Sequence, residues 1–181
     1  MKKIIFLILT LANLLYAHNY NEVLLKAQAS IFPKIVLLDK KLSNKLIDGK
    51  IVYTIVYDKN DYQTALDIRK FIDESYDGHF DEYEYKISLV EFSDLSNETQ
   101  ASAIYVLNTS MNMQKVAKIV KEKGVVAFSY DLENLKQGLL FSLLLEKSTV
   151  LYLNKENLDT QKVDFLDSLL QIVKFIDNDN G

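Results

Sequence analysis

Polar residues follow the segments that the sequence predicts as strands. In open α/β sheets, ligands bind outside the carboxyl ends of the strands, where helix N-termini point. A polar or anionic small molecule could be held there by side chains of Asp58, Asn60, Asn108, Thr109, Ser110, Ser129 and Tyr130. The same residue types also cap helices. The pattern therefore allows two interpretations, a ligand site or a set of helix caps.

Motifs for covalent or nucleotide chemistry are absent from the chain. It has no cysteine, no G-x-S-x-G turn and no H-E-x-x-H motif, and its five glycines form no phosphate-binding loop. Carboxylate pairs such as Asp58 and Asp61 occur in any α/β protein. The sequence therefore predicts a protein that is not an enzyme and holds no cofactor.

The two histidines, His18 and His79, are the candidates for metal chemistry. His18 could hold copper only with a second histidine nearby, and nothing in the pattern brings His79 to it. His79 lies in the acidic segment 77–84, whose carboxylates suit Ca²⁺ although their spacing does not match an EF-hand loop. We predict no metal site and leave cation binding by this segment open.

The N-terminus has the pattern of a secretory signal peptide. Lys2 and Lys3 precede an uncharged apolar stretch from Ile4 to Leu15, and Ala17 supplies a small residue at its end. This stretch is shorter than the roughly 20 residues of a membrane-spanning helix. We expect residues 1–17 to be cleaved, residues 18–181 to form one domain, and the mature protein to be periplasmic. The lack of cysteine excludes a lipoprotein and a disulfide framework.

Charge disfavours nucleic acid as a partner. The formal net charge of −4 becomes −6 once Lys2 and Lys3 leave with the signal, and Arg69 is the only arginine. Binding to phosphates needs clustered basic residues, and bidentate phosphate contacts favour arginine.

Strand and helix patterns alternate along the chain. Strands are predicted at 51–58, 85–92, 103–109 and 125–129, with helices at 61–75 and 111–123 and a hairpin at 138–154. A first helix from residue 20 is expected to be interrupted at Pro33, and a long helix is expected at 155–177. This order predicts an α/β fold of one lobe, with a three-layer, mostly parallel, Rossmann-like or flavodoxin-like sheet. Helices cover both faces, and the hairpin is antiparallel.

From about Val23 to Ile176 the chain resembles the YfiR-like periplasmic proteins. The similarity rests on the order of "LLKAQASIFPKIVLLD", "YTIVYD", "VVAFSYD", "QGLLFSLLLE", "VLYLN" and "FLDSLLQI". The usual glycine pair is reduced to Gly138, and the cysteines of some relatives are absent. The resemblance implies a non-enzymatic regulatory or sensor protein that binds an inner-membrane signalling protein, of the diguanylate cyclase or histidine kinase type.

The stretch 125–146 also resembles one lobe of some ABC-transporter substrate-binding proteins. That resemblance implies an alternative function, a small single-lobe substrate-binding component.

The apolar hairpin allows two interpretations: helices cover both of its faces, or its free surface packs on another protein. On the second interpretation, residues of the hairpin and of the first helix dock a partner, and a homodimer is the default assembly. The docking candidates are Phe32, Ile35, Leu139 and Phe141.

Overall fold

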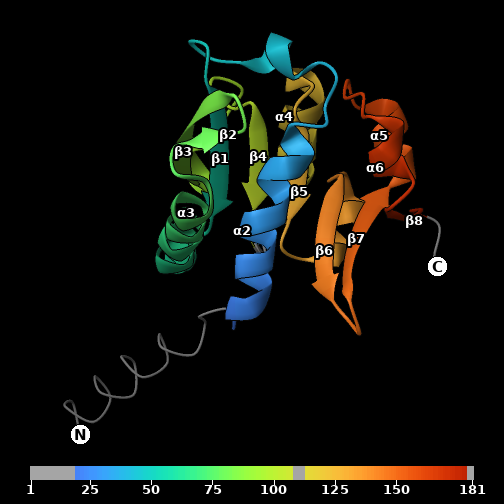
Figure 1. Cartoon of the computed structure of the whole chain (residues 1–181), viewed down its shortest axis with the longest axis horizontal. Coiled ribbons are helices and arrows are strands. Elements are labelled where there is room, and N and C mark those ends of the chain that lie inside the picture. Colours follow the sequence, from blue (N-terminus) through green and yellow to red (C-terminus); the bar gives the residue numbers. More distant parts are fainter. Residues whose placement is uncertain (1–18, 108–112, 179–181) are drawn as a thin grey trace, which may run out of the picture.

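The computed structural model describes residues 19–107 and 113–178, which form one eight-stranded sheet flanked by helices (Figure 1). In sheet order the strands are β2 (His79–Phe80), β3 (Tyr83–Glu91), β1 (Ile51–Tyr57), β4 (Ala103–Val106), β5 (Val126–Ser129), β6 (Phe141–Leu145), β7 (Thr149–Asn154) and β8 (Lys174–Ile176).

The helices differ in length and position. The α-helices are α2 (Glu22–Val36), α3 (Tyr62–Tyr76), α4 (Met113–Lys123), α5 (Lys155–Thr160) and α6 (Asp167–Leu170). Short 3₁₀ turns are η2 (Leu42–Lys45), η3 (Lys59–Asp61), η4 (Phe92–Asp94) and η5 (Leu132–Gln137). Within the described ranges, no helix has the length and apolar character needed to cross a membrane.

The sheet has the doubly wound order of flavodoxin-like folds. Strands β3, β1, β4, β5 and β6 are neighbours and run parallel, so the chain passes from β1 to β3 on one side and then to β4 on the other. β6 and β7 form the antiparallel hairpin, and β8 adds a parallel strand beyond β7. The predicted fold class is confirmed.

Burial explains the composition of the central strand β1. All six residues from Ile51 to Val56 are buried. Tyr53 and Ile55 pack with side chains of α2 and α3, whereas Val56 packs with those of α4 on the other face. A strand that is covered on both faces has a continuous run of apolar residues, which is the pattern seen in the sequence.

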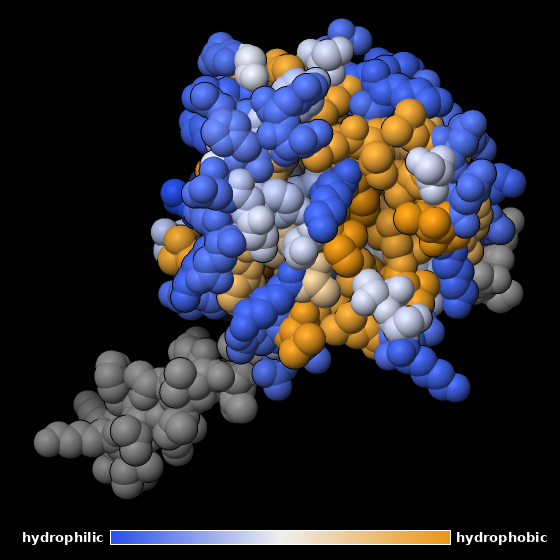
Figure 2. Space-filling view, in the orientation of Figure 1, coloured by the Kyte–Doolittle hydropathy of each residue, from blue (hydrophilic) through white to orange (hydrophobic). Residues whose placement is uncertain are grey.

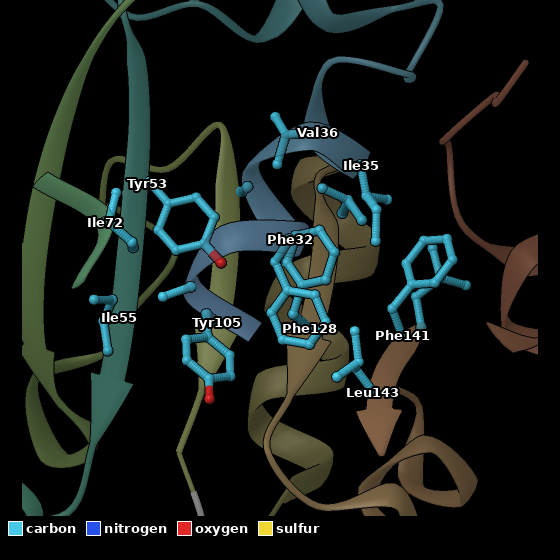
Figure 3. Close-up of a cluster of buried hydrophobic side chains, with 14 of the residues drawn as sticks. Phe32, Ile35, Val36, Tyr53, Ile55, Ile72, Tyr105, Phe128, Phe141 and Leu143 are labelled. Atoms are coloured by element: carbon cyan, nitrogen blue, oxygen red, sulfur yellow. The ribbon is translucent and has the colours of Figure 1, made fainter. Parts of the chain in front are cut away.

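The core beneath α2 is aromatic (Figure 3). The ring of Phe32 stacks on Phe128 with centroids 4.5 Å apart, and Phe128 lies 5.8 Å from Phe141. Phe141 in turn meets Phe165 edge-on at 5.2 Å. This row of rings joins α2 to the middle of the sheet and to the C-terminal segment.

The predicted docking residues are part of this core. Phe32, Leu139 and Phe141 are fully buried, and Ile35 is 2% exposed. A side chain must be exposed to bind another protein, so none of the four can form a docking surface of the folded chain. Their apolar character reflects packing between the helices and the sheet.

Pro33 does not interrupt the first helix. It lies inside α2, which begins after the cap residue Asn21 and continues to Val36. Pro33 lacks the N–H that would bond the carbonyl of Ala29. Burial of Phe32, Ile35 and Val36 offsets that loss and keeps the helical path.

The long C-terminal helix was predicted wrongly. Within the described part of 155–177, only α5 and α6 are helical, and residues 174–176 form β8. Between α5 and α6, Phe165 forms an antiparallel bridge with Asp39. Backbone hydrogen bonds also join Lys40 to Asp164 and Leu166 to Leu38. Long-range backbone pairing therefore replaces the helix that the apolar spacing predicted.

We predict that Phe32→Ala lowers the free energy of unfolding by about 3 to 5 kcal/mol, because it opens a cavity under α2. Val23→Ala on the same helix is the control, since Val23 is 66% exposed, and it should change stability by less than about 0.5 kcal/mol. Urea unfolding of both variants measures the difference. Equal stabilities would show that Phe32 is not a core residue.

Candidate functional site

The carboxyl ends of the parallel strands lie along one edge of the sheet. At this edge the strand order reverses between β1 and β4. The first turn of α2 lies toward the same end of the molecule (Figure 1). In doubly wound folds this reversal leaves a crevice for ligands. The residues around it are therefore the first candidates for a binding site.

Three side chains, which we call the edge cluster, join α2 to this end of the sheet: Tyr20, Asp61 and Tyr130. The hydroxyl of Tyr20 donates a hydrogen bond to Oδ2 of Asp61 at 2.8 Å. The Tyr20 ring meets the Tyr130 ring edge-on at 4.8 Å, and the N–H of Asn21 donates to the Tyr130 hydroxyl at 2.9 Å. Asp61 is 2% exposed. The edge cluster therefore fixes the start of α2 over the carboxyl ends of β1 and β5.

A buried amide lies behind the edge cluster. Nε2 of Gln28 donates to the carbonyl oxygen of Leu143 at 3.0 Å and to that of Tyr130 at 3.4 Å. Its Oε1 accepts a hydrogen bond from the Tyr105 hydroxyl. Burial raises the pKa of Tyr105 well above its usual value, so this hydroxyl keeps its proton and remains a donor.

A cavity of about 460 Å³ opens beside Tyr20, between the N-terminal halves of α2 and α3. Its lining combines two carboxylates, one ammonium group, small polar groups and an apolar surface. The lining residues are Asn19, Tyr20, Glu22, Leu25, Thr64, Asp67, Lys70 and Phe71. The volume lies within the range of small-molecule sites.

The charges of this cavity already have partners on their own helices. Glu22 lies 2.6 Å from Lys26, and the hydrogen bond and charge of Lys26 lower the pKa of that carboxyl. Lys70 lies 3.7 Å from Glu74. All four side chains are more than half exposed, so these pairs are weak and can exchange for contacts with a ligand.

The structure separates the sequence-predicted ligand residues. Tyr130 belongs to the edge cluster, Asp58 is half-buried and Asn60 is exposed beside it. Ser129 is fully buried, and its Oγ accepts hydrogen bonds from the N–H of Asp131 and from Nδ2 of Asn134. Ser129 therefore holds the turn after β5 and is not open to a ligand. Asn108, Thr109 and Ser110 lie outside the described residues.

Helix capping accounts for other polar residues at the strand ends. Asp131 accepts a hydrogen bond from the N–H of Glu133 at the start of η5, and Asn154 caps α5 through the N–H of Asn157. Both contacts fit the capping interpretation of the sequence.

Sequence reasoning missed the roles of Tyr20 and Gln28. The first helix was expected to begin at residue 20, but Tyr20 lies just before α2 begins. Gln28 is a polar residue within an otherwise apolar helix face and is fully buried. That break in the apolar pattern was the available signal for a buried polar contact.

Metal binding finds no support in the part of the chain that the structure describes, where no three His, Asp or Glu side chains gather as ligands. His79 is exposed and pairs with Glu84 across the tight turn between β2 and β3. His18 lies outside the described residues.

Two solved structures share this fold. A conserved domain protein from Vibrio cholerae matches with a TM-score of 0.55 and 13% identity, over 83% of this chain and 59% of that one. The ABC domain of Streptococcus pneumoniae in complex with L-tryptophan matches with a TM-score of 0.52 and 10% identity, over 79% of this chain and 60% of that one. This chain thus spans about three fifths of the length of each. No protein-family model and no curated protein matches the sequence.

We predict that Tyr20→Phe lowers the free energy of unfolding by about 1 to 2 kcal/mol, since it removes a hydrogen bond to a buried carboxylate. Tyr62→Phe, at a tyrosine that is 49% exposed, is the matched control and should be close to neutral. Chemical denaturation of the two variants decides the question. If both behave alike, the Tyr20 hydroxyl does not hold α2 to the sheet.

Proposed function

We propose that this chain is an exported, periplasmic binding protein without enzymatic activity, which takes a small polar ligand in the cavity beside Tyr20. The observation that carries the proposal is the place of this cavity. It lies next to the edge cluster, near the strand reversal where doubly wound folds bind ligands. The shared fold with a domain that holds L-tryptophan supports a ligand-binding role.

The cavity lining favours a zwitterionic ligand of amino-acid size. Glu22 and Asp67 offer carboxylates to an ammonium group, and Lys70 offers an ammonium group to a carboxylate. Phe71 and Leu25 supply apolar surface for a side chain. A ligand with both charges fits this lining better than a purely anionic or apolar one.

We predict that an L-amino acid binds the protein measurably in isothermal titration of all twenty, whereas its N-acetyl amide, which has neither charge, does not. Lys70→Gln should weaken this binding about tenfold or more, since a hydrogen bond to a charged group contributes about 1.5 to 3 kcal/mol. Lys118→Gln is the control, because Lys118 forms the same i,i+4 pair with Glu122 on α4. Absence of binding at millimolar concentrations of every amino acid would overturn the proposal.

A second candidate function is regulation of an inner-membrane signalling protein. Residues 19–107 and 113–178 form one sheet, and among them no second lobe closes over the cavity, as one does in a two-lobe substrate-binding protein. A broad hydrophobic surface extends beside α2 over β6 and β7 (Figure 2). The C-terminal part of the chain also carries exposed apolar side chains, namely Leu145, Leu166, Ile172 and Phe175. Such surfaces favour a protein partner.

A transport role and a regulatory role predict opposite results in cells. In a strain that lacks the protein, a transport role predicts reduced uptake of the labelled ligand and an unchanged cyclic-di-GMP level. Regulation of a diguanylate cyclase predicts unchanged uptake and an altered cyclic-di-GMP level. Complementation with the Lys70→Gln variant connects either effect to the cavity. A loss of uptake alone would favour the transport role, and an altered cyclic-di-GMP level alone would favour the regulatory role.

A further inference from the structure

Carboxylates outnumber ammonium groups around the cavity beside Tyr20. The charged side chains that line it, or that pair with its lining, are Glu22, Lys26, Asp67, Lys70 and Glu74. Three carboxylates and two ammonium groups sum to a net charge of −1. Asp61, which is 2% exposed and bonded to Tyr20, adds a further carboxylate behind the cavity. A neutral zwitterion leaves this excess of negative charge unchanged, whereas a ligand with a second cationic group offsets it.

Asp67 is the lining carboxylate that has no ion pair among the described residues. Its Oδ1 accepts a hydrogen bond from Nε2 of Gln63 at 3.1 Å, and its side chain is half-buried. Glu22, by contrast, already pairs with Lys26, whose Nζ also lies 5.1 Å from the centroid of the Phe71 ring. A half-buried charge is screened less by water than an exposed one. Asp67 is therefore the lining group that gains most from a cation of the ligand.

The other two lining charges are placed for the α-groups of an amino acid. The hydrogen bond and charge of Lys26 lower the pKa of Glu22, and the charge of Lys70 on the facing helix adds to this effect. Glu22 on α2 and Lys70 on α3 therefore lie close together across the cavity. An α-ammonium and an α-carboxylate, which share one carbon atom, need such an adjacent pair of opposite charges.

The position of Asp67 sets the distance to the second cation. Asp67 precedes Lys70 by three positions on α3, so the two side chains are neighbours, with Cβ atoms about 5 to 6 Å apart. The side chains of ornithine, lysine and arginine carry their cation about one helical turn away from the α-carbon. A basic amino acid can thus contact Lys70 and Asp67 at the same time.

We propose that the ligand of this cavity is an L-amino acid with a cationic side chain, of the ornithine, lysine or arginine type, and that this cation binds Asp67. The α-carboxylate binds Lys70 in exchange for Glu74, and the α-ammonium group binds Glu22 in exchange for Lys26. The methylene groups of the ligand lie against the apolar part of the lining. This inference rests on the proposed function and specifies the class of its ligand.

Two analogues of lysine test the class of ligand in isothermal titration. L-Norleucine has the same α-groups and a chain of similar length but no side-chain cation, and it should bind at least tenfold more weakly than L-lysine. Cadaverine has both ammonium groups but no carboxylate for Lys70, and it should also bind at least tenfold more weakly. Equal affinity of either analogue and L-lysine would overturn the inference.

The same titrations separate this inference from the proposed function. Norleucine that binds as tightly as lysine would leave a general amino-acid site in place and remove only the preference for a basic side chain. Absence of binding by every amino acid would overturn both.

Substitution of Asp67 tests the residue that receives the cation. Asp67→Asn should reduce the ratio of the lysine affinity to the norleucine affinity about tenfold or more, whereas Asp67→Glu keeps the charge and should retain most of the preference. Asp159→Asn, at an exposed carboxylate on α5 far from α3 (Figure 1), is the matched control and should leave the ratio unchanged. An unchanged ratio in Asp67→Asn, or a ratio that Asp159→Asn reduces equally, would contradict the proposal.

Discussion

The position of the first helix depends on one buried amide. Gln28 is the polar residue on the face that α2 presents to the sheet, and it must find partners because an unpaired buried amide is costly. It contacts Tyr105 on β4, Tyr130 after β5 and Leu143 on β6. These three contacts fix the position of α2 along its own axis and its rotation about that axis. The aromatic stack of Phe32 and Phe128 then fills the remaining space.

This placement shapes the site at the carboxyl edge. Because α2 begins at the strand ends, Tyr20 and Tyr130 lie over the reversal between β1 and β4, where many doubly wound proteins leave an open crevice. The space left for a ligand is displaced toward α3, between Tyr20 and Phe71. A ligand there would touch the helix whose anchor is Gln28.

The strands and most of the helices could be predicted, because buried strands carry β-branched runs and α3 and α4 show a regular apolar stripe. The C-terminal segment could not, because its pairing with residues 38–40 is a long-range effect. The signal in the sequence was the alternation of apolar Val163 and Phe165 with Lys162 and Asp164, which fits an extended chain better than a helix, and both apolar residues are buried. The sequence placed candidate ligand residues at the carboxyl ends of the strands, but none of those that the structure describes lines the cavity beside Tyr20. The contacts of Tyr20 and Gln28 could not be predicted because they are long-range: Tyr20 bonds Asp61, 41 positions away, and Gln28 bonds Tyr105, 77 positions away.

The contacts of α2 have a consequence for the order of folding. The backbone of Asn21 bonds Tyr130, 109 residues later, and Gln28 bonds Leu143, 115 residues later. Contacts that close such long loops form slowly, so the packing of α2 on the more distant β6 is expected to follow its packing on the nearer α3. In a chain exported N-terminus first, as we propose, folding can be completed only after β6 has crossed the membrane.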